Sequence, residues 1–345
     1  AAGQGMLLNR RLFSQCKSLA PTLKSLHEIS GTSLCHRKPS GSRNLQTMNG
    51  GVVKKADIVL GCVAYCSGIS SIWNGMKQYF ATKNMNVDYI LFTSYEAQVE
   101  ALMNKQVDIA WNGPLAHCRV KQRTDNTSLS LGMRDCDRDF RSHFIVTEES
   151  GIKTLKQLEG QILAAGTVDS PQAYILPLHH LKSKGVDLGS LSVVRFDRDV
   201  GKHGDTAEGE VEVMEALKRG EAAAGIVSDL MWQRALAAGK VNADGKKMRV
   251  LEEGPALFDH CQFDALATLE AAKKDAFQQA LFAMDWNNEF HKEIMKMEGI
   301  KKTWAGPREE GYAAMQQIVD NEPNVPYPRM LHEAQRHPFK SLLVK

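Results

Sequence analysis

The stretch Gly166–Leu181, which reads GTVDSPQAYILPLHHL, decides the fold. It follows a short apolar run, Ile162–Ala165, that is typical of a buried strand. Asp169 and Ser170 both offer side chains that can cap a helix, and Pro171 stands where the first helical residue needs no N–H. Such a strand, turn and helix direct free backbone N–H groups at one point, which is the outline of an anion site. The alternative, from these residues alone, is an ordinary turn between a strand and a helix.

The same alternation of strands and helices extends in both directions along the chain. Buried strands are expected at 57–63, 87–92, 107–111 and 193–196, and the first three lead through turns into helices. Further elements are expected as strands at 129–133, 142–146, 222–227, 248–251 and 262–268, a short helix at 150–158 and a long helix at 271–297. This rhythm predicts an α/β protein with parallel strands joined by right-handed crossovers.

Two such α/β halves, with the last segment returning to the first half, predict a clamp of two lobes. We expect lobe 1 to comprise residues 56–142 and 262–320 and lobe 2 to comprise 143–261, with a leader at 1–55 and a C-terminal extension at 321–345. In open α/β lobes, ligands bind where the carboxyl ends of strands meet helix N-termini. The cleft between the lobes is therefore the expected site.

Charge is distributed unevenly along the 345 residues, which carry a net charge of +3. Residues 1–55 hold nine Lys or Arg and one acid, so this segment carries +8 and the remainder carries −5. A mildly acidic body argues against a nucleic-acid partner. No stretch is long and apolar enough to span a membrane. The seven cysteines follow no disulfide framework, which favours a reducing compartment.

The basic segment 1–55 has apolar residues at helical spacing, frequent Ser and almost no acid. This pattern is typical of a mitochondrial transit peptide and predicts a location in the matrix. The alternative is a cytoplasmic protein with a disordered basic N-terminus.

Three longer stretches resemble a known family. They are FTSYEAQVEALMNKQVDIAWNGPLAH at 92–117, SGIKTLKQLEGQILAAGTVDSPQAYILPLHHL at 150–181 and GKHGDTAEGEVEVMEALKRGEAAAGIVSD at 201–229. Together they resemble the phosphate-, phosphite- and phosphonate-binding subunits of bacterial ABC importers. The resemblance extends over about 57–311 and implies the bilobal type II periplasmic-binding-protein fold, with two doubly wound lobes joined by short hinge strands.

The resemblance also implies a set of ligand-binding residues. It places Tyr95 and Asn112 in the first lobe, the turn Ser170 to Ala173 with Gln172 in the second, and His203 against the oxyanion. The two acidic positions that would recognise an aminoalkyl group match least well: Asp229 lies near one, and His260 falls about where the other would be. From the residues themselves we add Tyr65 and Cys66, which lie in the loop after the first strand.

This chain departs from the family at the second-lobe turn, where Pro171 and Gln172 replace hydroxyl residues. Each lost charge-assisted hydrogen bond is worth about 1.5–3 kcal/mol, so the turn supports an anion better than it identifies which anion. His260 and Cys261 are adjacent, so in a strand only one of them would face the cleft. We favour His260, with a structural loop histidine as the alternative.

Two functions follow. The first is a protein that binds a small anionic ligand, such as a phosphonate-like or phosphate-like oxyanion or a related metabolite, in the interlobe cleft. Because no importer partner of this kind is expected in a mitochondrion, a stand-alone binder or sensor is favoured. The second is an enzyme on the same fold that uses Cys66, His203 and His260. No cofactor is predicted, and a transition metal assembled in three dimensions is the open alternative.

Overall fold

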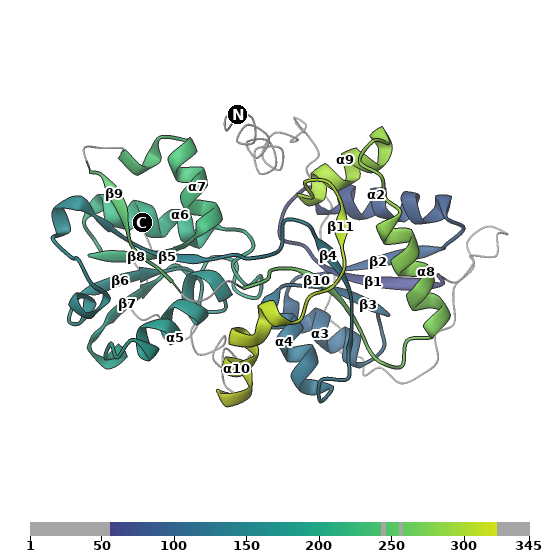
Figure 1. The fold of residues 1–345 in the computed structure, drawn as a ribbon, viewed down its shortest axis with the longest axis horizontal. Coiled ribbons are helices and arrows are strands. Elements are labelled where there is room, and N and C mark those ends of the chain that lie inside the picture. The colour runs from purple at the N-terminus through teal and green to yellow at the C-terminus, as the bar shows by residue number, and fades with distance from the viewer. Residues whose placement is uncertain (1–55, 243–245, 255–257, 323–345) are drawn as a thin grey trace, which may run out of the picture.

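The protein is described by a computed structural model that covers residues 56–242, 246–254 and 258–322. The predicted leader and nearly all of the predicted C-terminal extension lie outside these residues. Within them the chain forms two β-sheets that belong to two lobes lying side by side (Figure 1). No helix in the described ranges has the length and apolar character needed to cross a membrane.

Lobe 1 is built on a six-stranded sheet with the order β11-β4-β10-β3-β1-β2. Its strands are β1 (Ile58–Val63), β2 (Val87–Phe92), β3 (Ile109–Asn112), β4 (Leu129–Arg134), β10 (Gln262–Ala265) and β11 (Trp304–Ala305). The first three strands run parallel, whereas β10 is antiparallel to both β3 and β4. The sheet of lobe 1 is therefore completed by a strand that arrives late in the sequence.

Lobe 2 is built on a five-stranded sheet with the order β7-β6-β8-β5-β9. Its strands are β5 (Ser142–Thr147), β6 (Ile162–Ala165), β7 (Ser192–Arg195), β8 (Ala224–Ser228) and β9 (Met248–Glu253). The strands β7, β6 and β8 are parallel, and β5 lies antiparallel between β8 and β9.

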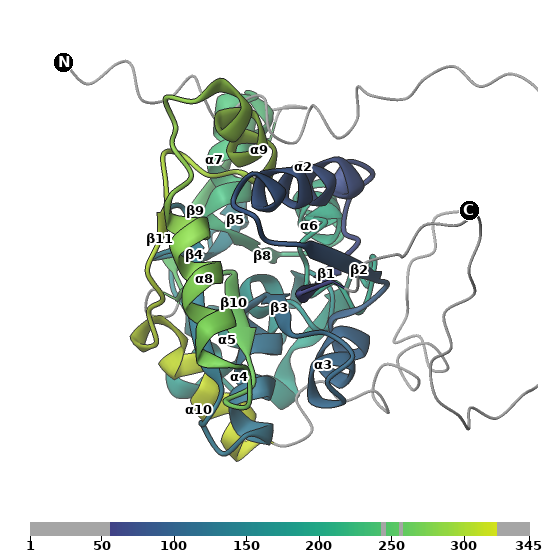
Figure 2. The ribbon, with the colours of Figure 1, turned by 90° about the vertical axis from the view of Figure 1, so that its right-hand side faces the viewer.

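Helices cover both faces of each sheet. They are α2 (Ile69–Thr82), α3 (Tyr95–Met103), α4 (Pro114–Arg123), α5 (Leu176–Ser183), α6 (Glu208–Arg219), α7 (Asp229–Ala237), α8 (Ala271–Phe282), α9 (Glu289–Glu298) and α10 (Ala313–Asn321). In lobe 1, α2, α8 and α9 contribute to the core on one face, and α3 and α4 to the core on the other (Figure 2). In lobe 2, α6 and α7 pack on one face and α5 on the other.

The turn that the sequence singles out forms as expected. Ser170 is the N-cap, Pro171 is the first helical residue, and a π-helical turn η4 (Pro171–Ile175) continues into α5. The helix after β2 is capped by Ser94, whose hydroxyl accepts from the Ala97 N–H at 3.2 Å.

Two predicted helices are wrong in extent. The expected helix over 150–158 is replaced by two 3₁₀ turns, η2 (Glu148–Ser150) and η3 (Leu155–Leu158), because Gly151 between them is left-handed at φ 68°. The expected helix over 271–297 is two helices, α8 and α9. They are separated by a turn in which Asp285 accepts the Asn287 N–H and Asn288 caps α9.

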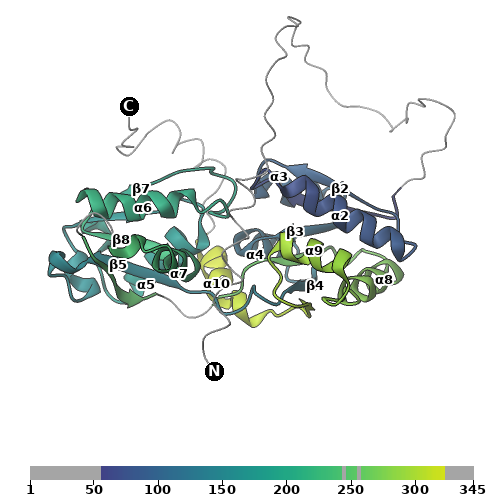
Figure 3. The ribbon, with the colours of Figure 1, turned by 90° about the horizontal axis from the view of Figure 1, so that it is seen from above.

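The chain crosses between the lobes twice, at residues 135–141 and again after β9, where the described residues of the crossing are 254 and 258–261. The two crossings are held together by paired backbone hydrogen bonds between Phe140 and Phe258, and by one from the His260 N–H to the Asp137 carbonyl at 2.7 Å. Helix α10 lies at this junction and packs against α4 of lobe 1 and α5 of lobe 2 (Figure 3). The crossings and α10 therefore form the base of the clamp.

Candidate functional site

A cavity of about 420 Å³ lies between the lobes. Lobe 1 contributes the loop after β1, the end of β4 and the end of α9, whereas lobe 2 contributes the start of α7 and the loop before α6. The crossings supply further lining residues, among them Phe140, His260 and Cys261. The cavity therefore lies where the two lobes and both crossings meet, as the fold predicts for a ligand site.

The loop of residues 196–207 in lobe 2 touches the N-terminus of α3 in lobe 1. The Tyr95 N–H donates to the Gly201 carbonyl at 2.8 Å, and the Tyr95 ring stacks on His203 with 4.6 Å between centroids. The Lys202 ammonium donates to the Ala64 carbonyl. These contacts join the two lobes in a closed arrangement.

An ion pair strengthens the same contact. His203 Nε2 lies 3.0 Å from a Glu96 carboxylate oxygen, which also accepts from Arg119 at 2.6 Å. Burial would raise the pKa of Glu96, but His203 and then Arg119 lower it to about 2. Both His203 and Tyr95 are almost completely buried, so their side chains are engaged in closure.

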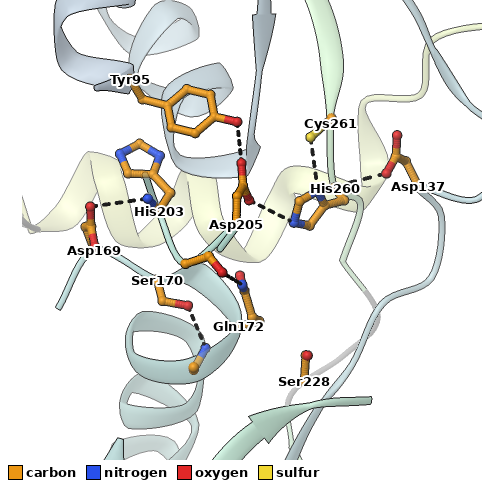
Figure 4. Close-up of polar contacts among 12 residues, drawn as sticks. Tyr95, Asp137, Asp169, Ser170, Gln172, His203, Asp205, Ser228, His260 and Cys261 are labelled. Carbon is orange, nitrogen blue, oxygen red and sulfur yellow. Dashed lines mark hydrogen bonds and ion pairs between the residues drawn. The ribbon is translucent and has the colours of Figure 1, made fainter. Parts of the chain in front are cut away.

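Asp205 connects the closed lobes to the crossing segments. Its Oδ2 accepts from the Tyr95 hydroxyl at 2.5 Å, and its Oδ1 lies 3.5 Å from His260 Nε2 (Figure 4). Burial raises the pKa of the Asp205 carboxyl, and His260 and Tyr95 oppose that shift. A carboxylate of lobe 2 is thus placed against the Tyr95 hydroxyl of lobe 1 and the His260 imidazole of the second crossing.

The turn after β6 uses its own polar groups internally. The Ser170 hydroxyl accepts from the Ala173 N–H at 3.0 Å. The neighbouring Asp169 carboxylate accepts from the Gly201 N–H at 2.6 Å and the His203 N–H at 3.3 Å (Figure 4). The Gly201 and His203 N–H groups are therefore bound to a carboxylate of the chain itself, and the Lys202 N–H donates to the Asp199 carbonyl at 3.0 Å.

Asn112 belongs to a separate buried network in lobe 1. Its amide nitrogen donates to Asp264 at 2.8 Å, and its amide oxygen accepts from Gln98 at 2.7 Å. The other Asp264 oxygen lies 2.9 Å from His117 Nδ1. Burial alone would lower the pKa of His117, but Asp264 and then Glu309 raise it to about 9. Every polar end of Asn112 already has a partner.

Arg134 is a largely buried cation that lines the cavity. It forms two bonds of 2.6 Å to Asp137, through Nε and Nη2, and Nη1 donates to the Glu298 carbonyl at 2.7 Å. A guanidinium has five N–H donors, so two remain without a hydrogen bond to the described residues. Arg134 can therefore hold a ligand oxyanion while its plane stays fixed by Asp137.

Buried carboxylates also line the cavity. Glu210 accepts from the Ser228 N–H at 2.6 Å and hydroxyl at 2.7 Å, and burial raises its pKa. Neither Glu298 carboxylate oxygen has a short hydrogen bond from the described residues; the Arg134 guanidinium lies 3.6 Å from one oxygen, and the Trp111 side chain is a weaker contact. Burial raises the pKa of Glu298 to about 7, against the effect of Arg134. The cavity thus mixes cationic donors with under-bonded acidic groups.

The expectation that only one of His260 and Cys261 faces the cleft is wrong. Both residues line the cavity, and His260 Nδ1 lies 3.0 Å from Cys261 Sγ. The alternation of faces holds only within a strand, and β10 begins one residue later, at Gln262.

The residues predicted to bind the ligand fall into two groups. The first group lines the cavity and comprises Tyr65, Cys66, Gln172, Asp229 and His260. The second group does not line the cavity and comprises Tyr95, Asn112, Ser170, Ala173 and His203. The side chains of Tyr95, Asn112, Ser170 and His203 instead make hydrogen bonds within the protein.

Sequence reasoning missed Arg134, Asp205, Glu210 and Glu298. Arg134 ends a strand, which is the position from which α/β folds present site residues. Asp205 stands two residues after His203 in the GKHGD motif, which was a usable signal. Glu298 follows a run of alternating Met and Lys at a helix end, and no sequence feature distinguishes it.

Comparison with known proteins agrees with this geometry. The profile of the family described as "ABC transporter, phosphonate, periplasmic substrate-binding protein" matches residues 69–307. A curated relative, the probable ABC transporter phosphite binding protein PhnD1 of Prochlorococcus marinus, is 29% identical over 118 residues. That alignment spans 32% of this chain and only 39% of the relative.

Two solved structures have a similar fold. PhnD1 of Prochlorococcus marinus in complex with methylphosphonate has a TM-score of 0.59 at 18% identity, over 76% of this chain and 97% of that one. XAC2383 of Xanthomonas citri bound to ATP has a TM-score of 0.60 at 16% identity, over 78% of this chain and 97% of that one. The predicted bilobal fold of type II periplasmic binding proteins is confirmed, and ligands as different as these two show that the fold leaves the ligand open.

Proposed function

The chain belongs to the family of periplasmic phosphonate substrate-binding proteins of ABC transporters, and we propose on that premise that its interlobe cavity binds a small anionic ligand. A single observation supports the proposal most strongly. The family match over 69–307 includes both lobes, and the cavity of about 420 Å³ opens between them.

We assign the main anion contact to Arg134 rather than to the turn at Ser170. The Ser170 hydroxyl and the 201–203 backbone are already bonded within the chain. Arg134 lines the cavity with N–H groups left over, and a guanidinium stays charged at every physiological pH. Its fixed plane suits a tetrahedral oxyanion.

Calorimetric titration of the purified chain with methylphosphonate, phosphite and phosphate tests this proposal. We expect saturable binding of at least one of the three and a matching rise in melting temperature. Ligand at a hundred times its dissociation constant stabilises the native state by about 2.7 kcal/mol. No heat and no thermal shift with any of these oxyanions would contradict anion binding.

Replacing Arg134 by Gln tests the assigned contact. We expect affinity to fall roughly tenfold to a hundredfold, because a charge-assisted hydrogen bond is worth about 1.5–3 kcal/mol. Arg141→Gln is the matched control, since Arg141 is exposed and does not line the cavity. Circular dichroism must show that each variant is folded, because Arg134 also neutralises Asp137.

We further propose that residues 1–55 direct the protein to mitochondria and that it acts as a stand-alone binder there. The basic, acid-poor and amphipathic character of the segment supports this. Residues 1–55 fused to a fluorescent protein should reach mitochondria, and diffuse cytoplasmic fluorescence would refute the targeting.

A further inference from the structure

Three side chains of metal-binding type meet where the two crossings run side by side. Asp137 lies on the first crossing, and His260 and Cys261 lie on the second. One donor atom from each lies within 4.8 Å of the other two, and His260 Nδ1 is 3.0 Å from Cys261 Sγ and 3.9 Å from Asp137 Oδ1 (Figure 4). A single ion between these three atoms requires only small side-chain shifts.

The backbone beneath these donors is fixed. The His260 N–H donates to the Asp137 carbonyl at 2.7 Å, and the Tyr312 hydroxyl donates to the His260 carbonyl at 3.0 Å. Arg134 holds both Asp137 oxygens from one side. A carboxylate oxygen can accept more than one contact, so Asp137 keeps lone pairs for an ion.

The second nitrogen of His260 has the partner that metal-bound histidines usually have. Metal-ligating histidines commonly direct their other ring nitrogen at a carboxylate, which fixes the ring and its tautomer. His260 Nδ1 faces Cys261 and Asp137, whereas Nε2 faces Asp205 Oδ1 at 3.5 Å (Figure 4). Asp205 is in turn held by the Tyr95 hydroxyl.

An independent observation points to a missing cation in the same cavity. Glu298 is 2% exposed and lines the cavity, and neither of its carboxylate oxygens has a short hydrogen bond from the described residues, the Trp111 side chain being a weaker contact. Arg134 is already paired with Asp137, and its Nη1 lies 3.6 Å from a Glu298 carboxylate oxygen. A buried carboxylate with so few partners would be stabilised by a bound cation nearby, as it is otherwise by taking up a proton.

We propose that Asp137, His260 and Cys261 form a binding site for a divalent transition metal of the zinc type, with its fourth position open to the interlobe cavity. Sulfur, nitrogen and oxygen donors together suit Zn²⁺ rather than Mg²⁺ or Ca²⁺, which prefer oxygen. Three protein donors and one open position are the arrangement in which zinc accepts an external ligand.

Lobe closure and metal binding should be coupled. Asp205 orients His260 from lobe 2, whereas the three donors belong to the crossings at the base of the clamp. An open clamp would remove Asp205 from His260 and leave the metal more weakly held.

The test uses the full chain, stripped with a chelator and titrated with Zn²⁺ and then Co²⁺ in the absence of any anionic ligand. We expect one bound ion per chain and, with Co²⁺, a thiolate-to-cobalt charge-transfer band. Cys261→Ser and His260→Gln should each abolish stoichiometric binding, and Cys261→Ser should remove the band. Cys136→Ser, at a thiol that lines the same cavity outside the cluster, should keep both.

Asp205→Asn should weaken metal affinity roughly 10–100-fold while the charge-transfer band persists at saturation. Absence of stoichiometric Zn²⁺ binding overturns the proposal, and so does a charge-transfer band that survives in folded Cys261→Ser. Anion binding by the stripped protein, measured separately, would stand in either case, so failure of the metal site is distinguishable from failure of the anion site.

Discussion

Two buried polar clusters of this protein differ in how completely they are satisfied. The cluster of Gln98, Asn112, His117 and Asp264 lies inside lobe 1, and both oxygens of its carboxylate have partners within 2.9 Å. The interlobe cavity holds Glu298 and Asp205, with carboxylate oxygens that lack hydrogen bonds from the described residues. The Asp264 carboxylate is fully bonded without any ligand, although Gln98 Oε1 in the same cluster lacks a hydrogen bond from the described residues, whereas the cavity carboxylates keep oxygens that a ligand or ion could contact.

The largest effect is expected from breaking the cluster inside lobe 1. Asp264→Ala leaves the His117 imidazolium and the Asn112 amide buried without their acceptor. The free energy of unfolding should fall by about 3–5 kcal/mol, as for other buried pairs that lose one partner. Urea denaturation at pH 7 measures the change, and a loss within the range of ordinary surface substitutions would show that the cluster contributes little.

A pH dependence should separate His117 from the cavity groups. Its pKa is raised to about 9 in the folded state, against about 6.5 in the unfolded chain. The stabilisation that the His117–Asp264 pair contributes is therefore fully present below pH 6.5. It is lost as the pH rises through about 9, and the total loss is about 3 kcal/mol. The loss should be visible as a difference in unfolding free energy between the wild type and His117→Gln, which converge at alkaline pH.

Glu298→Gln should have a smaller effect of opposite sign. Because burial raises the pKa of Glu298 to about 7, its charged form destabilises the folded state increasingly as the pH rises from about 4.5 through 7. In metal-free protein at pH 8 the variant should be more stable than the wild type by roughly 1–3 kcal/mol, and at pH 5 nearly equal. Calorimetric melting at both pH values measures the difference in stability. A variant less stable than the wild type at pH 8 would show that the Glu298 carboxylate makes stabilising contacts in the folded protein.

The smallest effect is expected at Ser170, whose hydroxyl is bonded within the chain but whose turn includes the cavity-lining Gln172. If its hydroxyl serves only to cap η4, Ser170→Ala should lower the free energy of unfolding by about 1 kcal/mol. Affinity for the anion that binds the wild type should then change less than twofold. A tenfold loss of affinity with unchanged stability would move Ser170 into the ligand site.

The fold could be predicted from the sequence because its signals are local. Alternating strands and helices, the Ser170–Pro171 helix start and the late return to lobe 1 are all visible in short stretches. The split between α8 and α9 was missed because Asp285 and Asn288 make a turn and a cap inside a run of good helix formers.

The site was predicted only in part because its partners are distant in the sequence. Asp205 and His260 come from separate segments of the chain, one in lobe 2 and one on the second crossing, and Arg134 with Glu298 brings together a strand end and a helix end. No local sequence pattern predicts such pairs. The resemblance to phosphonate binders indicated Tyr95 and His203, whose side chains here contact each other and close the lobes.

The position of β10 between β3 and β4 has a consequence for the order in which the protein is made. A ribosome releases all five strands of the second sheet before it releases Gln262, so lobe 2 can fold while lobe 1 still lacks a central strand. Until then β3 and β4 each present an unpaired edge, which is the kind of surface that nascent chains use to aggregate. The sheet of lobe 1 can therefore be completed only after the whole of lobe 2 has been synthesised. We expect chains that stop short of β10 to depend most on chaperones.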